Sequence, residues 1–114
     1  MTIDFANLDK AFKEHEQQFK EATLEVMSSA RYILGKETDE FEEKLREFTG
    51  SSYALGCSSG TDALLLALMA LGIRSRDEII TTPFTFIATA ETIACLGAKP
   101  VFVDITLDTC NINT

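Results

Sequence analysis

The sequence has no tryptophan, a single histidine and little positive charge. Its 10 Lys and Arg residues are outnumbered by 18 Asp and Glu residues, so the formal net charge is −8 at pH 7. Nucleic acid is not expected as a partner, because proteins hold its phosphates with clustered Lys and Arg. The histidine, His15, lies between Glu14 and Glu16, where a solvated side chain is expected rather than a catalytic one.

Cysteine is also scarce, and long apolar runs are missing. The three cysteines are far apart and form no Cys-x-x-Cys pair, so neither a disulfide framework nor a zinc site is expected. A reducing cytoplasm is the expected location. The longest apolar run, Ala63 to Leu71, has nine residues, whereas a helix needs about 20 to cross a membrane. We therefore expect no membrane span, and the acidic first residues do not resemble a signal peptide.

The first 50 residues are predicted to form a helical arm. The composition, 46% hydrophobic and 25% charged, is typical of a globular protein. Apolar residues recur at helical spacing from Leu8 to Met27 and again after Thr38, a candidate N-cap, up to Gly50, a candidate helix end. The second helix is rich in acidic residues between 37 and 47, but the basic residues among them favour a solvated face over a metal site.

Residues 51–114 are predicted to begin an α/β sheet within one partial domain, 1–114. Short apolar segments alternate with helical ones, which is the pattern of βαβ units and a mainly parallel sheet. The predicted elements are a strand at 53–57, a helix at 61–71, a strand at 78–82, a helix at 86–96 and a strand at 100–104. The helix at 61–71 is apolar on every side, so a larger domain or a second subunit must cover it, and a homodimer is expected. The turn-like tail, 106–114, leaves the alternation unclosed, which indicates a truncated domain.

The first candidate site is the segment from Cys57 to Asp62, where the strand at 53–57 ends, a turn follows and a helix begins. It contains Ser58, Ser59, Gly60, Thr61 and Asp62. Free backbone N–H groups at a helix N-terminus bind phosphate, and a glycine lets the phosphate approach closely. The ordinary alternative is that Ser59 or Thr61 merely caps the helix, and from spacing alone this alternative is the stronger one. The turn matches neither a dinucleotide fingerprint nor a nucleoside-triphosphate loop.

The second candidate site is the segment 82–89, which follows the strand at 78–82. It emerges at the carboxyl edge of the sheet, where open α/β sheets bind ligands. An aromatic ring in this segment, Phe84 or Phe86, could stack on a flat cofactor. The ordinary alternative, a phenylalanine of the hydrophobic core, is again the stronger one from the residues alone.

Five ordered segments then favour the functional interpretation of both sites. They are RYILG at 31–35, SGTDAL at 59–64, DEIIT at 77–81, TFIATA at 85–90 and PVFVD at 100–104. In order and spacing they resemble the DegT/DnrJ family of pyridoxal-phosphate-dependent sugar-nucleotide aminotransferases, and the similarity runs from about residue 3 to the last. The chain is similar to the N-terminal segment of such an enzyme.

The resemblance implies the large domain of a type I pyridoxal-phosphate-dependent aminotransferase, with the cofactor at a subunit interface. It also implies transfer of an amino group from glutamate to a keto-sugar nucleotide. Gly60, Thr61 and Asp62 would hold the cofactor phosphate, mostly through backbone N–H groups and the Thr61 hydroxyl, with Ser59 adjacent. Phe86 would stack on the pyridine ring. Tyr32 would lie near the substrate, although its ordinary alternative is a helix-end aromatic packed on the core.

The chain departs from the family in its lysines. The chemistry needs a lysine that forms a Schiff base with the cofactor and a carboxylate paired with the pyridine nitrogen. In the family both belong to later segments, and none of the lysines here suits the role. We therefore expect the 114 residues alone to be inactive. Two alternatives stay open, which are a non-catalytic binding or regulatory protein derived from this fold and another type I enzyme such as a desulfurase.

Overall fold

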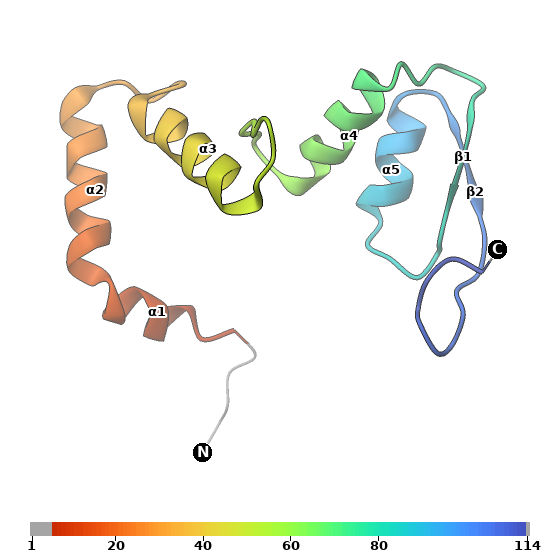
Figure 1. Ribbon diagram of the computed structural model, residues 1–114, viewed down its shortest axis with the longest axis horizontal. Coiled ribbons are helices and arrows are strands. Elements are labelled where there is room, and N and C mark those ends of the chain that lie inside the picture. Colours follow the sequence, from red (N-terminus) through yellow and green to blue (C-terminus); the bar gives the residue numbers. More distant parts are fainter. Residues whose placement is uncertain (1–5, 114) are drawn as a thin grey trace. The chain divides into compact units, whose positions relative to one another are not determined.

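A computed structural model describes residues 6–113, and Figure 1 labels the helices and strands. The chain divides into two compact units, one up to Gly56 and the other from Cys57 onward. The first unit contains helices α1 (Leu8–Glu14), α2 (Glu16–Ser29) and α3 (Lys36–Thr49). The second contains α4 (Gly60–Ala70), β1 (Glu78–Thr81), α5 (Ala88–Cys95) and β2 (Lys99–Phe102).

The single helix predicted from Leu8 to Met27 is wrong, because the chain bends at His15. His15 has φ −122° and ψ 17°, which are not helical values, and α1 and α2 meet there. The bend brings the rings of Phe12 and Phe19 into a stack, with centroids 5.9 Å apart and planes 11° apart. Residues seven apart on a straight helix are separated by about 10 Å along its axis. The stacked rings therefore depend on the break.

Helix α3 begins earlier than the sequence predicts. Gly35 occupies the N-cap in an extended conformation, and the N–H of Thr38 donates to its carbonyl at 3.0 Å, so Thr38 lies inside the first turn. The prediction of Thr38 as the cap is wrong, because the backbone N–H of Thr38 already forms a hydrogen bond of the first helical turn. The predicted end at Gly50 is confirmed, with φ 68°. On this helix Glu43 pairs with Arg46 at 2.5 Å and Glu40 with Lys36 at 3.2 Å.

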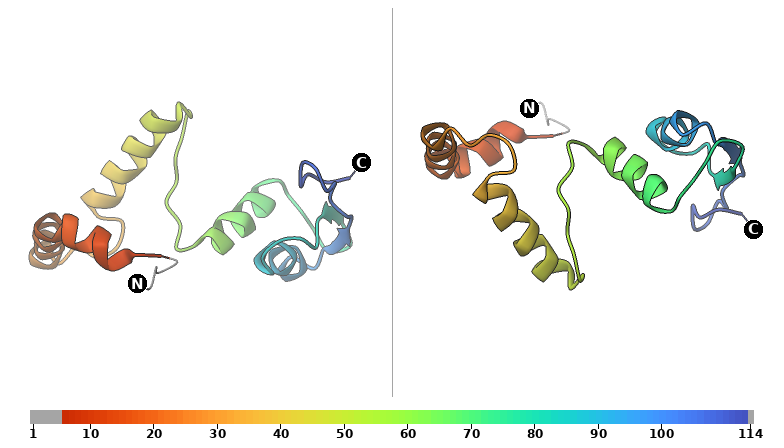
Figure 2. Two further views of the ribbon diagram at one scale, coloured as in Figure 1. Left: turned by 90° about the horizontal axis from the view of Figure 1, so that it is seen from below. Right: turned by 90° about the horizontal axis from the view of Figure 1, so that it is seen from above.

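The second unit is built on a parallel pair of strands. β1 pairs with β2 in register from Glu78 with Lys99 to Thr81 with Phe102, and α5 connects them as a βαβ unit. α5 packs on both strands and against α4, and Figures 1 and 2 show α5 between α4 and the strand pair. The α/β class with a parallel sheet is therefore confirmed. The tail beyond β2 turns back on itself through an antiparallel bridge between Ile105 and Ile112.

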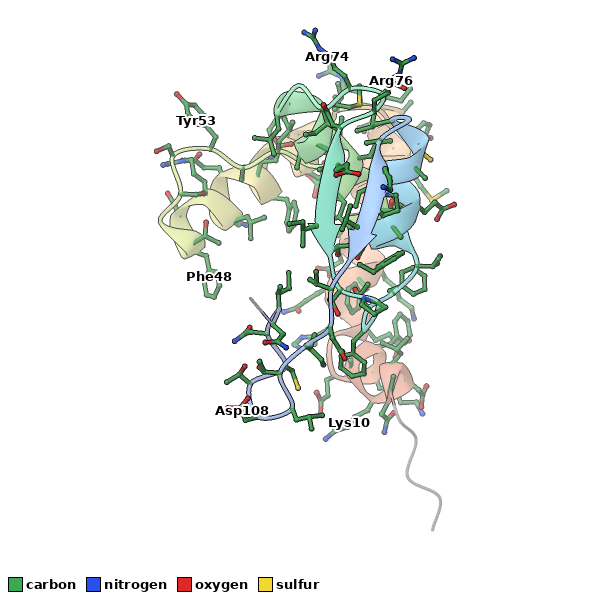
Figure 3. All side chains as sticks on the ribbon, turned by 90° about the vertical axis from the view of Figure 1, so that its right-hand side faces the viewer. Lys10, Phe48, Tyr53, Arg74, Arg76 and Asp108 are labelled. Atoms are coloured by element: carbon green, nitrogen blue, oxygen red, sulfur yellow. The ribbon has the colours of Figure 1, made fainter. Side chains whose placement is uncertain are left out.

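The strand predicted at 53–57 is wrong, and the sheet of the described residues has two strands instead of three. A strand needs a neighbour to satisfy its backbone groups, and no described segment pairs with this one. The N–H of Gly56 instead donates to the Glu42 carboxylate at 2.6 Å. Tyr53 and Leu55 are 88% and 82% exposed, and Figure 3 shows Tyr53 projecting from the ribbon.

Burial concentrates on α5. Ile93 and Thr92 are each 2% exposed, and the Thr92 hydroxyl donates to the Ala88 carbonyl at 2.9 Å, so this buried polar group is satisfied. Helix α4 has no buried residue, and Leu66 and Met69 on it are about half exposed. The expectation that the chain does not cover this apolar helix therefore holds. Within residues 6–113, the helices are too short or too polar to traverse a bilayer.

Two helix ends allow a matched test of backbone strain. Ala30 ends α2 with φ 54° and Gly50 ends α3 with φ 68°, both in the left-handed region that disfavours residues with a Cβ. We expect Ala30→Gly to raise the free energy of unfolding by roughly 0.5–1 kcal/mol and Gly50→Ala to lower it by about 1 kcal/mol. A Cβ at Gly50 would meet no atom within 4 Å, so its cost is conformational. Chemical denaturation checks both, and a stabilising Gly50→Ala would contradict the assigned helix end.

Candidate functional site

The start of α4 presents free backbone donors. Ser59 is the N-cap in an extended conformation, and its Oγ accepts the N–H of Asp62 at 3.1 Å. Its carbonyl accepts the N–H of Ala63 at 3.0 Å, the first bond of the helix. The N–H groups of Gly60 and Thr61 lie ahead of that bond, and no acceptor for them occurs in the described part of the chain. These two donors stand at the positive end of the helix dipole.

The Asp62 carboxylate folds back onto the same turn. Its Oδ2 accepts the hydroxyl of Ser58 and, at 3.0 Å, the hydroxyl of Ser59. These hydrogen bonds, that of Ser58 first, lower the pKa of Asp62 below its ordinary value, so the carboxylate is charged at neutral pH. A charged carboxylate in the first turn is favourable to the helix dipole.

Ser58 lies in the predicted segment, but the sequence prediction gave it no role. The signal was the spacing, because a hydroxyl four residues before an aspartate at a helix start can reach its carboxylate when the intervening turn is tight. The ordinary alternative for Ser59 is also present here, since Ser59 does cap the helix. Capping and anion binding are compatible, because the cap uses the Asp62 N–H and leaves those of Gly60 and Thr61.

The turn fits a phosphate group on two observations. A Cβ built on Gly60 would meet no heavy atom within 4 Å, so the space beside its backbone is open to a ligand. The Thr61 hydroxyl adds a third donor next to the two backbone N–H groups, and it has no recorded partner among residues 6–113. Phosphate oxygens need several convergent donors. Gly60 and Thr61 are therefore the residues that would hold such a group.

The two candidate phenylalanines lie just before α5 and are not part of the core. Phe86 is 75% exposed and Phe84 is 71% exposed, so the alternative of a core phenylalanine does not hold for this chain. Figure 1 shows that α4 and α5 both begin at the end of the second unit where β1 ends. The turn at 59–62 and the segment of Phe86 therefore lie at the same edge of this unit, the carboxyl edge where α/β sheets bind ligands.

Tyr32 belongs to the first unit, between α2 and α3. Its hydroxyl donates to the carbonyl of Met27 at 3.2 Å, near the end of α2 where carbonyls lack helical partners. The ring is 68% exposed and borders an open depression of about 470 Å³ formed by residues 30–36 and Asp39. Its hydroxyl therefore supports a helix end, and its contact with a substrate stays a prediction.

Most of the lysines form ion pairs with carboxylates. Five of the six pair with a carboxylate at 4 Å or less, namely Lys10, Lys13, Lys20, Lys36 and Lys99. A lysine that attacks a carbonyl must lose its proton, and this requires a lowered pKa. The hydrogen bond from Lys99 to Glu78 instead raises the pKa of Lys99. Lys99 also starts β2, at the edge of the sheet opposite to the turn at 59–62.

Several known proteins with related sequences are named as aminotransferases of nucleotide-linked sugars, and others carry different names. The chain is 43% identical over 111 residues to UDP-2-acetamido-2-deoxy-3-oxo-D-glucuronate aminotransferase of Pseudomonas aeruginosa, covering 97% of the chain and 31% of that protein. It is 40% identical over 113 residues to a protein of Geobacillus stearothermophilus named pleiotropic regulatory protein, covering 99% of the chain and 30% of the relative. The chain thus spans about 30% of the length of these relatives.

Solved structures agree with the fold. A DegT DnrJ EryC1 StrS aminotransferase from Brucella abortus superposes with a TM-score of 0.93 at 41% identity, over 98% of this chain and 30% of that one. NtdA of Bacillus subtilis, solved with bound cofactor PMP, superposes with a TM-score of 0.85 at 28% identity, over 92% of this chain and 24% of that one.

The family model described as the DegT/DnrJ/EryC1/StrS aminotransferase family matches residues 13–114. That range contains α2 and α3 together with the whole of the second unit. It also contains the turn with free N–H groups at the start of α4. On this match, on the sequence identities and on the superpositions, the chain belongs to the DegT/DnrJ/EryC1/StrS aminotransferase family.

Proposed function

We propose that this chain provides the phosphate-binding part of a pyridoxal-phosphate-dependent aminotransferase that acts on keto-sugar nucleotides. The observation that carries the proposal is the pair of free N–H groups at Gly60 and Thr61, beside open space, in a chain of this family. A helix start with unpaired donors favours a phosphate monoester such as that of the cofactor. Bound PMP in a structural neighbour supports this cofactor class.

The roles of the residues follow from their positions. Gly60 and Thr61 would hold the cofactor phosphate, and Asp62 and Ser59 belong to the same turn. Phe86, exposed at the same edge, would stack on the pyridine ring. When bound, the cofactor supplies an electron sink for carbanion chemistry. Tyr32 would contact the substrate.

The substrate class rests on the relatives. The Pseudomonas aeruginosa relative is named for a UDP-linked 3-oxo sugar acid, which supports a keto-sugar nucleotide as acceptor here. Glutamate is the proposed amino donor, as the family resemblance implies. The half-exposed apolar side chains of α4 support a homodimer of the complete gene product, because exposed apolar surface of this kind marks an interface. The cytoplasm is the proposed location.

A second function is favoured by two specific observations. Five of the six lysines pair with a carboxylate at 4 Å or less, and the Geobacillus relative is named a regulatory protein. A non-catalytic protein that keeps the phosphate turn is therefore the alternative. Under either function, we propose that residues 1–114 alone do not catalyse transamination, because the chemistry needs a lysine of lowered pKa.

Cofactor colour separates these two functions. We expect the complete gene product to show the visible absorbance of lysine-bound pyridoxal phosphate, which borohydride abolishes, and residues 1–114 alone to show none. Glutamate, the proposed amino donor, should bleach this absorbance, whereas alanine, the control amino acid, should not. A colourless complete product would favour the non-catalytic alternative. Reducible colour in the 114 residues would contradict the argument from the lysines.

Replacing Phe86 tests the stacking role. We expect Phe86→Ala to weaken pyridoxal phosphate binding roughly 2- to 10-fold, because aromatic stacking contributes about 0.5–1.5 kcal/mol beyond area burial. Phe84→Ala is the matched control, since Phe84 is equally exposed in the same segment and should leave binding within 2-fold. The measurement is a titration with cofactor after dialysis. Equal losses in both variants, or none in Phe86→Ala, would remove Phe86 from the site.

A further inference from the structure

We infer that Asp62 is a positioning residue of the turn before α4, and that Ser58 and Ser59 act through Asp62 instead of contacting the cofactor phosphate. The inference rests on the proposed function, because it concerns how the same turn would hold the phosphate. It divides the residues of the turn into two groups. Gly60 and Thr61 are the donors, whereas Ser58, Ser59 and Asp62 hold those donors in place.

The two serine hydroxyls have no hydrogen left for a phosphate. Each serine hydroxyl has one hydrogen to donate, and Oδ2 of Asp62 accepts both of them. The N–H of Asp62 is used as well, because it donates to Oγ of Ser59. A phosphate dianion accepts hydrogen bonds and donates none, so neither serine can serve it while the Asp62 contacts persist. Apart from the backbone N–H groups of Ser58 and Ser59, which precede the helix, the donors left in this turn are the N–H groups of Gly60 and Thr61 and the Thr61 hydroxyl.

The charge of Asp62 also places Asp62 among the positioning residues and not among the phosphate donors. The two serine hydroxyls lower the pKa of Asp62, so its carboxylate stays ionised while the cofactor binds at neutral pH. An ionised carboxylate repels a phosphate, so Asp62 cannot contribute by direct contact. It can contribute only by fixing the backbone, and Ser59 is the residue whose extended conformation sets the direction of the next two N–H groups.

The turn has few other restraints. Besides the Asp62 contacts, the bonds recorded for residues 57–59 are those from the Cys57 thiol and from the Ala63 N–H to the Ser59 carbonyl, at 3.4 Å and 3.0 Å. All these side chains are solvent-accessible, so surrounding packing does not fix the turn in their place. Loss of the carboxylate should therefore allow Ser58 and Ser59 to leave the geometry that aims the donors.

The test measures coupling between these residues in the complete gene product. The variants are Asp62→Ala, the double Ser58→Ala/Ser59→Ala and the triple combination, and the ligands are pyridoxal phosphate and pyridoxal, which lacks the phosphate. We expect Asp62→Ala to weaken pyridoxal phosphate binding roughly 5- to 30-fold, as for loss of a charged hydrogen-bond partner. Pyridoxal binding should change less than 2-fold, and the triple variant should lose no more than Asp62→Ala does.

Asp62→Asn is the conservative control, since its amide oxygen still accepts a serine hydroxyl, and it should bind more tightly than Asp62→Ala. It also replaces Asp62→Ala in the comparison if that variant does not fold. Losses that add across the single and combined variants would overturn the inference, because independent contacts are additive. Tighter pyridoxal phosphate binding in both Asp62 variants would also overturn the inference, because Asp62 would then act only by repelling the phosphate. If the wild-type protein binds no pyridoxal phosphate, the proposed function fails as well, whereas additive losses leave it standing.

Discussion

The site depends on unsatisfied backbone donors at the first turn of a helix. Every α-helix leaves such donors, and most proteins satisfy them with a side chain or with water. Here Ser59 satisfies one, that of Asp62, and leaves those of Gly60 and Thr61. The packing of α4 beside the βαβ unit then matters, because α5 packs against both α4 and the strands and holds the second unit together through its buried residues. The helix that presents the free donors is therefore packed, through α5, on the strand pair.

The parts of the fold that the sequence predicts well are those that local pattern determines. The strands at β1 and β2 and the helices α4 and α5 each have a predicted counterpart within about two residues, because their apolar periodicity and their boundaries agree. Three predictions were wrong, namely the unbroken helix across His15, the cap at Thr38 and the strand at 53–57. The stack of Phe12 on Phe19 accompanies the break at His15, and Gly35 takes the cap position predicted for Thr38. The segment 53–57 lacks a partner strand among residues 6–113, which is a non-local cause that its own residues do not show.

The sequence predicts which residues form the candidate site, but not the hydrogen bonds among them. The motif around Gly60 identifies the turn, and the resemblance to a family assigns it to a cofactor phosphate. The hydrogen-bond directions are a different matter, since they depend on where two serine hydroxyls point. The spacing of Ser58 and Asp62 makes a contact possible, but only the folded turn brings the Ser58 hydroxyl to the carboxylate. Phe86 and Phe84 are likewise equivalent by composition, and only the family pattern separates them.

The two-stranded sheet has a consequence for handling the isolated chain. Each strand has a neighbour on one side only, so among residues 6–113 the outer flanks of β1 and β2 expose rows of backbone groups. Such flanks recruit strands from other molecules. Ile80 is 62% exposed on β1, which adds an apolar side chain to that surface. Pro100 interrupts the row of donors on β2, and the Lys99–Glu78 ion pair adds charge at one end. Concentrated solutions of these 114 residues should therefore self-associate along β1 more readily than along β2.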